Sequence, residues 1–222
     1  MDACGCDDFA TIFDRRTAEK DRDRYRRKGP DPTTRMLLDL IGRRWYAGTT
    51  LLDIGGGIGV IDRELLRSGV GHAVLVDASR AYLDVARQEA RTANLMDRFE
   101  IVDGDFVERA AEIDRADIVT LDRVVCCYPD VESLVSLSAA KANQVYGLVL
   151  PRDRWIIRVG LGMLRFLLWL RRSAYRPYAH PNALVDGYAA AQGLHPTAEQ
   201  TTFWWRVVVY GRDDGAAASY AA

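Results

Sequence analysis

From Thr49 onward, short apolar runs alternate with segments in which apolar residues recur every three or four positions. The short runs predict five buried strands, at residues 49–54, 72–76, 99–102, 117–121 and 144–150. The segments between them predict helices at residues 58–67, 79–93, 105–112 and 131–142. Strands that alternate with helices in this way predict βαβ units and a parallel sheet covered on both faces.

Two helical and two strand patterns follow the fifth predicted strand. The helices are expected at about residues 153–172 and 181–192, and the strands at residues 194–200 and 203–210. Because only a short turn separates these last two strands, they must run antiparallel to each other. We therefore predict an α/β, doubly wound (Rossmann-like) sheet that ends in a β-hairpin and carries an inserted helix after strand five.

The chain before the first strand predicts two further helices. The apolar residues of segment 9–13 begin the first helix, and the break Gly-Pro-Asp-Pro at residues 29–32 ends the charged run that follows. The threonines at 33–34 are positioned to cap the second helix. We predict that residues 1–48 form a helical lid and that residues 49–222 form one structural unit.

Composition and charge narrow the class of protein. With 222 residues, 49% of them hydrophobic, and a net charge of −1, the chain fits one globular domain and does not predict a nucleic-acid partner. The polar start and the two close cysteine pairs predict a cytoplasmic protein with reduced thiols. Nothing in the sequence specifies an oligomeric state.

The predicted helix near residues 153–172 combines a strongly apolar sequence with several arginines. Arg158 and Arg165 interrupt the apolar run, so it does not predict a membrane span. Three interpretations stay open: a helix that faces the core, a cap over an apolar substrate pocket, or a helix that lies on a membrane surface.

The main chemical signal is a glycine loop between the first strand and the next helix. Gly55, Gly57 and Gly59 permit a tight turn and let a ligand approach the free N–H groups of the helix N-terminus. A dinucleotide fingerprint needs glycine where this chain has Val60. Asp53, just before the loop, would repel a pyrophosphate but attract a ligand that carries an ammonium and a sulfonium group.

Two later strand ends complete the predicted cofactor site. Asp77, followed by Ala78, ends the second strand, where a carboxylate can accept both ribose hydroxyls. Gly104, Asp105 and Phe106 follow the third strand, where the acid can bind an adenine amino group and the ring can pack on the base.

In order and spacing, the segment 53–59, Asp77 and the segment 104–106 resemble the motifs of class I S-adenosylmethionine-dependent methyltransferases. The resemblance implies the class I methyltransferase sheet, S-adenosyl-L-methionine as cofactor and methyl transfer to a small molecule. An NAD-dependent protein, which Val60 and Asp53 oppose, and a non-catalytic S-adenosylmethionine-binding protein are the alternatives.

The end of the fourth strand predicts the reaction side. Asp122, Arg123, Cys127 and Tyr128 follow that strand, at the sheet edge where ligands bind in open α/β sheets. The Asn-Pro-Pro-Tyr signature of amide and adenine N-methyltransferases does not occur, which argues against a nucleic-acid or glutamine substrate.

The segment 117–129 is similar to that of magnesium-protoporphyrin O-methyltransferases, and Tyr25 matches the lid tyrosine of that family. The resemblance implies carboxyl methyl ester formation, but the histidine proposed as catalytic in the family falls on Cys127 here.

Displacement at a sulfonium methyl group depends mainly on alignment and on exclusion of water. A carboxylate acceptor needs no base, whereas a phenol or amine needs one, for which Tyr25, Asp122 and Cys127 are candidates. His180 is a further candidate for substrate contact. We predict O-methylation of an apolar or acidic metabolite, with the porphyrin ester as the alternative. Cys4-Gly5-Cys6 has no second ligand pair at matching spacing, so no metal site is predicted.

Overall fold

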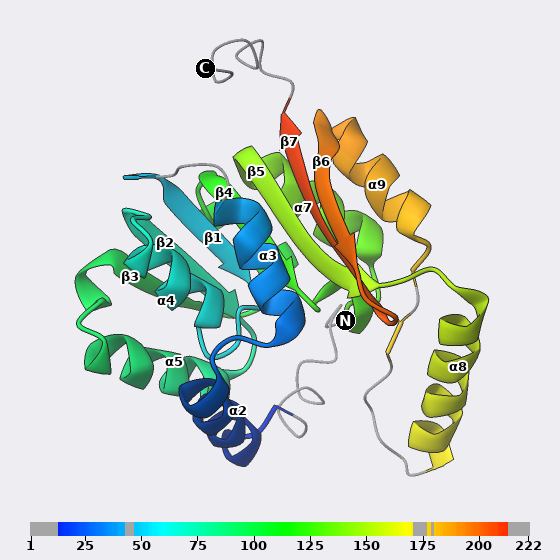
Figure 1. Ribbon diagram of the computed structural model, residues 1–222, viewed down its shortest axis with the longest axis horizontal. Helices are drawn as coiled ribbons and strands as arrows, with labels where there is room; N and C mark the ends of the chain where they lie inside the picture. Colours follow the sequence, from blue (N-terminus) through cyan, green and yellow to red (C-terminus); the bar gives the residue numbers. More distant parts are fainter. Residues whose placement is uncertain (1–12, 43–46, 171–176, 179, 213–222) are drawn as a thin grey trace.

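A seven-stranded sheet forms the centre of the protein in the computed structural model, which describes residues 13–42, 47–170, 177–178 and 180–212 (Figure 1). The strands are β1 (Thr50–Ile54), β2 (His72–Asp77), β3 (Phe99–Asp103), β4 (Ala116–Asp122), β5 (Ala142–Pro151), β6 (Leu194–Thr201) and β7 (Trp205–Arg212). Their order is β3-β2-β1-β4-β5-β7-β6. Strands β1 to β5 are parallel, and β7 is antiparallel to both β5 and β6. The predicted doubly wound sheet closed by a hairpin is confirmed.

Helices cover both faces of the sheet. They are α2 (Arg15–Lys28), α3 (Pro32–Gly42), α4 (Val60–Arg67), α5 (Arg80–Thr92), α6 (Phe106–Arg109), α7 (Val131–Lys141), α8 (Trp155–Leu170) and α9 (Asn182–Ala191). Side chains of α3, α4 and α5 pack on one face, and those of α6, α7 and α9 pack on the other. Helix α8 stands away from the sheet at one end of the molecule (Figure 1).

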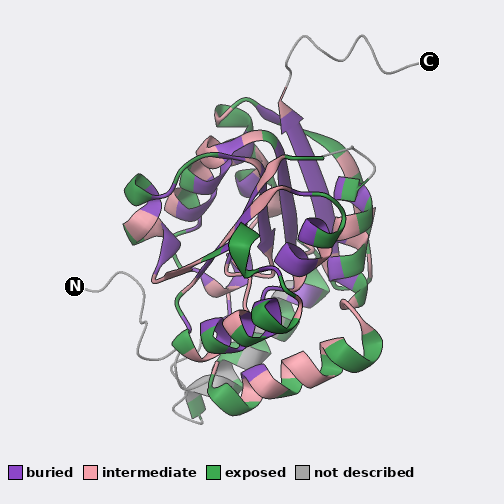
Figure 2. Ribbon diagram, turned by 90° about the vertical axis from the view of Figure 1, so that its left-hand side faces the viewer, coloured by how far each residue is buried: buried purple, intermediate pink, exposed green. Residues whose placement is uncertain are grey.

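The core lies in two layers, one on each side of the sheet. Leu51 and Ile118 face the layer of α3, α4 and α5, whereas Leu52 and Val119 face the opposite layer. Because neighbouring strand residues point to opposite faces, both faces are apolar, and the central strands β1, β4, β5 and β7 are mostly buried (Figure 2). Each fully buried aliphatic side chain contributes about 1.5–3 kcal/mol to stability.

Several helices begin later or end earlier than predicted, each for a local reason. Helix α4 begins at Val60 because Gly59 has a left-handed backbone with φ of 70°. The helix predicted over residues 105–112 is divided into α6 and a 3-10 turn at Ala110–Glu112.

The N-terminal helices also differ from the prediction. Helix α2 begins at Arg15, where the Asp14 side chain accepts a 2.8 Å hydrogen bond from the Thr17 N–H; residues 9–12 lie outside the described residues. Helix α3 begins at Pro32, whose missing N–H is tolerated in a first turn. Thr34 therefore lies inside the helix instead of capping it, and its hydroxyl is free to act elsewhere.

Candidate active site

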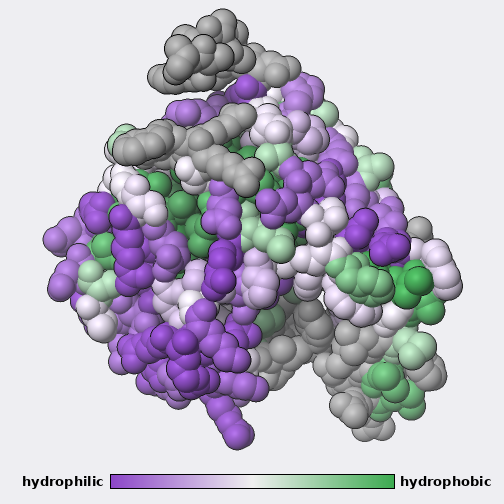
Figure 3. Space-filling view, viewed as in Figure 1, coloured by the Kyte–Doolittle hydropathy of each residue, from purple (hydrophilic) through white to green (hydrophobic). Residues whose placement is uncertain are grey.

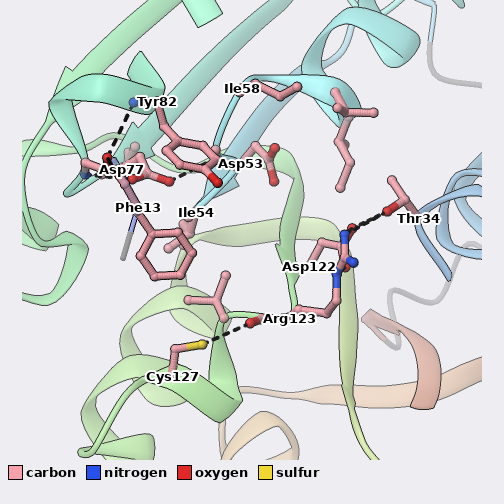
Figure 4. Close-up of a pocket in the computed structure, with 18 of the residues that line it drawn as sticks. Phe13, Thr34, Asp53, Ile54, Ile58, Asp77, Tyr82, Asp122, Arg123 and Cys127 are labelled. Atoms are coloured by element: carbon pink, nitrogen blue, oxygen red, sulfur yellow. Dashed lines mark hydrogen bonds and ion pairs between the residues drawn. The ribbon is translucent and has the colours of Figure 1, made fainter. Parts of the chain in front are cut away.

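A cavity of about 500 Å³ lies at the carboxyl ends of β1, β2 and β4 (Figure 4). The strand order reverses between β1 and β4, and open α/β sheets bind ligands at such a point. The volume suits a cofactor or small-molecule site, which typically measures about 300–1,000 Å³.

The glycine loop forms the floor of one half of the cavity. Gly55 has φ of 64°, and a Cβ added there would lie 2.6 Å from Val124 Cγ2. A Cβ added at Gly56 would lie 2.2 Å from Asp53 Oδ2. Gly55 and Gly56 therefore have no room for a side chain, and Gly57 and Gly59 have the left-handed backbone that favours glycine. That these glycines contact the cofactor stays a prediction. Gly56 was not singled out from the sequence.

Asp77 holds the loop in place from the end of β2. Its Oδ2 accepts a 3.0 Å hydrogen bond from the Gly57 N–H, and its Oδ1 accepts a 2.8 Å bond from the Ser79 N–H. Burial raises the pKa of Asp77. Ser79, not Asp77, caps α5 with its side chain, so the carboxylate keeps lone pairs that can accept ribose hydroxyls. Ala78 lines the cavity beside it.

The segment after β3 lies on the same side. Asp105 caps α6 by accepting a 2.7 Å bond from the Val107 N–H, and it also accepts bonds of 3.0 and 3.1 Å from the Tyr128 hydroxyl. Gly104, Asp105 and Phe106 all line the cavity. Tyr128, predicted on the substrate side, thus binds the acid predicted to contact adenine.

Asp53 lies beneath the glycine loop with a fully buried side chain. Its Oδ1 accepts a 2.6 Å bond from the Thr120 hydroxyl, and Asp62 of α4 is a neighbouring buried acid. Burial and the neighbouring Asp62 raise the pKa of Asp53, and burial raises the pKa of Asp62 to about 7. The buried site beneath the loop therefore favours the protonated form of both carboxyl groups.

The other half of the cavity holds a network of charged groups (Figure 4). Arg123 donates to Asp122 Oδ1 at 2.9 Å and to Asp31 Oδ2 at 3.1 Å. The Thr34 hydroxyl donates to Asp122 Oδ2, and Arg24 pairs with Asp31 at 2.9 Å. Arg123 is the first residue after β4. It has a φ of 63°, which is unusual for a residue with a side chain.

Cys127 lies beside this network. Its Sγ is 3.8 Å from Cys126 Sγ and 3.6 Å from the Arg123 carbonyl oxygen. The bond with Cys127, together with burial, raises the pKa of Cys126 well above its usual value.

Two predicted site residues point elsewhere. The Tyr25 ring lines the cavity, but its hydroxyl donates to Glu64 and accepts a 3.1 Å bond from Arg67, both on α4. Burial and the bond to Glu64 raise the pKa of Tyr25, which disfavours the phenolate. His180 is not among the described residues that line the cavity; its Nε2 lies 2.9 Å from the Tyr128 carbonyl oxygen.

Three aromatic residues that line the cavity were not predicted from the sequence: Phe13, Tyr82 and Trp205. Phe13 meets the Tyr82 ring edge-on at 5.6 Å, and its carbonyl accepts a 2.8 Å bond from the Ser79 hydroxyl. Trp205, the first residue of β7, lines the cavity at the other half. Tyr82, in the first turn of the helix after Asp77, was the one sequence signal that could have indicated these aromatic residues.

Within the described ranges, no three histidine, cysteine or acidic side chains group as metal ligands. Cys4 and Cys6 lie outside those ranges. None of the helices that the structure describes is long and apolar enough to cross a membrane.

Comparison with known proteins supports a methyltransferase domain. Residues 51–141 match the family model described as a methyltransferase domain. The chain is 27% identical over 132 residues to the ribosomal protein L11 methyltransferase of Dechloromonas aromatica, covering 58% of this chain and 45% of the relative. It is 39% identical over 70 residues to a ubiquinone/menaquinone biosynthesis C-methyltransferase of Roseobacter denitrificans, covering 31% of this chain and 27% of the relative. The chain thus spans less than half the length of these relatives.

Solved structures share the fold over most of the chain. The magnesium protoporphyrin IX methyltransferase of Synechocystis, with bound S-adenosylhomocysteine, superimposes with a TM-score of 0.67 at 19% identity and covers 91% of this chain and 99% of its own. An O-methyltransferase family protein of Burkholderia thailandensis superimposes with a TM-score of 0.72 at 18% identity. The superposition covers 93% of this chain and 63% of that protein.

Residues 51–141 therefore match a methyltransferase domain, and the fold is that of the class I, S-adenosylmethionine-dependent methyltransferases. S-adenosylmethionine is the cofactor of that class. The cavity fits it, because the glycine loop and the Asp77 carboxylate face one half of the cavity, as a nucleoside ligand requires.

Proposed function

We propose that this protein transfers the methyl group of S-adenosylmethionine to an oxygen atom of an apolar small molecule. The observation that carries the proposal is the two-part cavity, in which the glycine loop and Asp77 adjoin a second half around Asp122 and Arg123. When bound, the cofactor supplies an electrophilic methyl group on its sulfonium sulfur.

The cofactor half is assigned as follows. Asp77 and Ala78 bind the ribose, while Gly104, Asp105 and Phe106 bind the adenine. The backbone of Gly55, Gly57 and Gly59 lies against the remainder of the cofactor, with Asp53 holding the loop from below. Asp53 is fully buried and is bonded to Thr120, so it acts through the shape of the loop rather than by direct contact.

The acceptor half positions the substrate and excludes water. We assign Asp122 as the group that accepts a proton from a hydroxyl acceptor, with Arg123 and Thr34 fixing its orientation. Cys127 and Trp205 line the apolar part of this half. Tyr25 lies on α2, in the segment that we predict to act as a lid, with its hydroxyl engaged by Glu64.

The charges of the cavity favour a neutral apolar acceptor over an acidic one. Two arginines line the cavity, Arg24 and Arg123, and both are paired with aspartates. Six aspartates line it: Asp21, Asp31, Asp53, Asp77, Asp105 and Asp122. A carboxylate substrate would meet excess negative charge, which argues against porphyrin ester formation. The fold likeness to the Synechocystis enzyme is what keeps that alternative open.

Calorimetric titration with S-adenosylhomocysteine, and separately with NAD, tests the cofactor. We expect binding of the first ligand and none of the second, with a loss of at least about tenfold in affinity in Asp77→Ala, because two ribose hydrogen bonds disappear. Asp84→Ala, which removes an exposed carboxylate from α5, is the matched control and should bind normally. Binding of NAD alone, or of neither ligand, would overturn the proposal.

Turnover is then measured as S-adenosylhomocysteine release with apolar alcohols and phenols, with carboxylic acids and with amines. A hydroxyl acceptor whose turnover falls by about a hundredfold or more in Asp122→Asn supports the assignment. Turnover confined to carboxylic acids would favour ester formation instead.

A further inference from the structure

Helix α8 presents an apolar face to solvent. Trp155 is 73% exposed and Met163 is 64% exposed, although both are large apolar residues. Spacings of three and four residues place the exposed side chains on one side of the helix. They are Trp155, Ile156, Val159, Met163, Leu167 and Leu170. Ile157 is the one α8 side chain described as buried, and it holds the helix to the body.

The tip of the β6–β7 hairpin extends this face. Phe203 and Trp204 at the tip are both about half exposed. The Arg152 N–H donates to the Trp204 carbonyl oxygen at 2.9 Å, and the Arg154 guanidinium lies 5.5 Å from the centre of the Phe203 ring. These contacts place the hairpin tip next to the segment that leads into α8. The exposed apolar side chains of α8 together with Phe203 and Trp204 are here called the α8 surface; its α8 part shows as hydrophobic groups at the lower right of Figure 3.

The α8 surface is embedded in a strongly basic part of the chain. Residues 151–176 contain seven arginines and one acidic residue, Asp153. Arg154 and Arg165 are exposed beside the apolar face. A second copy of the chain docked on this face would bring the two basic segments together, which like-charge repulsion opposes.

We propose that the α8 surface docks on a lipid surface that carries anionic headgroups. A helix with an apolar face, flanking arginines and exposed tryptophan binds in the plane of such an interface. Helix α8 has 16 residues and so is only about 24 Å long, too short to cross a bilayer core of about 30 Å. Lying in the interface is the arrangement that its length and charge allow.

The position of the surface links it to the cavity. Strand β5 ends at Pro151, a few residues before α8, and β7 begins at Trp205, next to the exposed Trp204. Trp205 itself lines the cavity and pairs with Pro151 of β5, beyond β4 and away from the glycine loop, which places it on the acceptor side. Docking would therefore bring the acceptor half near the lipid, from which an apolar acceptor enters. This last step rests on the proposed function, whereas the docking does not.

Vesicle co-sedimentation of the full chain tests the docking. We expect binding to mixed phosphatidylglycerol and phosphatidylcholine vesicles, little binding to phosphatidylcholine alone, and weakening as salt is added. The double variant Trp155→Ser with Met163→Ser should lower the affinity by about tenfold or more, because two side chains leave the acyl region. Met96→Ser removes an exposed methionine far along the chain from α8 and should have no effect.

A charge pair of variants separates the electrostatic part. Arg154→Gln should weaken binding to anionic vesicles, whereas Arg115→Gln, an exposed arginine just before β4, should not. Equal binding to neutral and anionic vesicles, or no binding to either, would overturn the proposal. The proposal would also be overturned if light scattering showed that the protein is a stable dimer and that Met163→Ser dissociates it. Calorimetry with S-adenosylhomocysteine on the same variants is expected to be unchanged, so failure of docking and failure of the proposed function give different results.

Discussion

Replacing Asp62 with asparagine should stabilise the protein at about pH 8 and change its stability little at about pH 4. Asp62 is fully buried beside Asp53, and its carboxyl oxygens have no hydrogen-bond partner among the described residues. Burial raises the pKa of Asp62 from 3.8 to about 7. Above neutral pH the folded protein must therefore keep a charge in a site with almost no solvation.

The sign follows from the proton balance. Because the pKa in the folded state exceeds that in the unfolded state, the folded state binds more protons between about pH 4 and about pH 7. The free energy of unfolding therefore falls as pH rises through this window and stays reduced above it. A shift of about three pKa units at about 1.36 kcal/mol each sets the penalty at about 4 kcal/mol at most. Asparagine keeps the shape, carries no charge and can donate to Asp53.

Urea unfolding at a series of pH values measures the effect. The wild type should lose stability between about pH 4 and about pH 7, and Asp62→Asn should lose clearly less; the remaining slope belongs to Asp53, whose pKa is also raised by burial. Asp39→Asn, an exposed position on α3, is the control and should follow the wild type. Parallel pH profiles for wild type and Asp62→Asn would refute the reasoning.

Other substitutions probe the two halves of the cavity. Gly56→Ala should weaken S-adenosylhomocysteine binding by about tenfold or more, measured by calorimetry, because the new Cβ would lie 2.2 Å from Asp53 Oδ2 and the loop must shift; unchanged affinity would contradict the close-approach argument. Tyr128→Phe should cost about 1 kcal/mol in the free energy of unfolding through loss of the bond to Asp105; urea titration checks it, and a neutral result would mean that the bond adds nothing. Arg123→Gln should lower kcat/KM by about tenfold or more while cofactor affinity stays within about twofold, since it acts on the acceptor half; an equal loss in cofactor affinity would contradict that division.

The fold was predictable because its signals are local. Short apolar runs and helical periods alternate within a few residues of each other, and the hairpin strands are adjacent in the chain. The errors lie at the ends of elements, where single backbone conformations decide; the last strand, for example, begins at Trp205 and not at residue 203, because residues 203–204 form the hairpin tip. Gly59 in a left-handed conformation delays α4, and Pro32 at the first turn moves Thr34 into α3.

The position in the cavity of the residues assigned to the cofactor half was predictable for the same reason. The glycine loop, Asp77 and the segment 104–106 each follow a strand end directly, so the sequence already places them at one edge of the sheet. Asp62 was missed because a single acid early in an amphipathic helix usually faces solvent. The packing of α4 on β1 instead places the Asp62 side chain beneath the glycine loop, where it is fully buried.

The acceptor half depends on contacts between distant segments, and these have no local signal. Arg123 bonds to Asp31 across 92 positions of the chain, and Asp122 bonds to Thr34 across 88. Asp31, Thr34 and Trp205 all lie outside residues 51–141, the segment that matches the methyltransferase family model. The matched segment therefore contains the glycine loop and most of the residues of the cofactor half. It does not contain Asp31, Thr34 or Trp205, which lie around the acceptor half. Substrate choice should accordingly respond to changes in α3 and at the start of β7, while cofactor affinity should not.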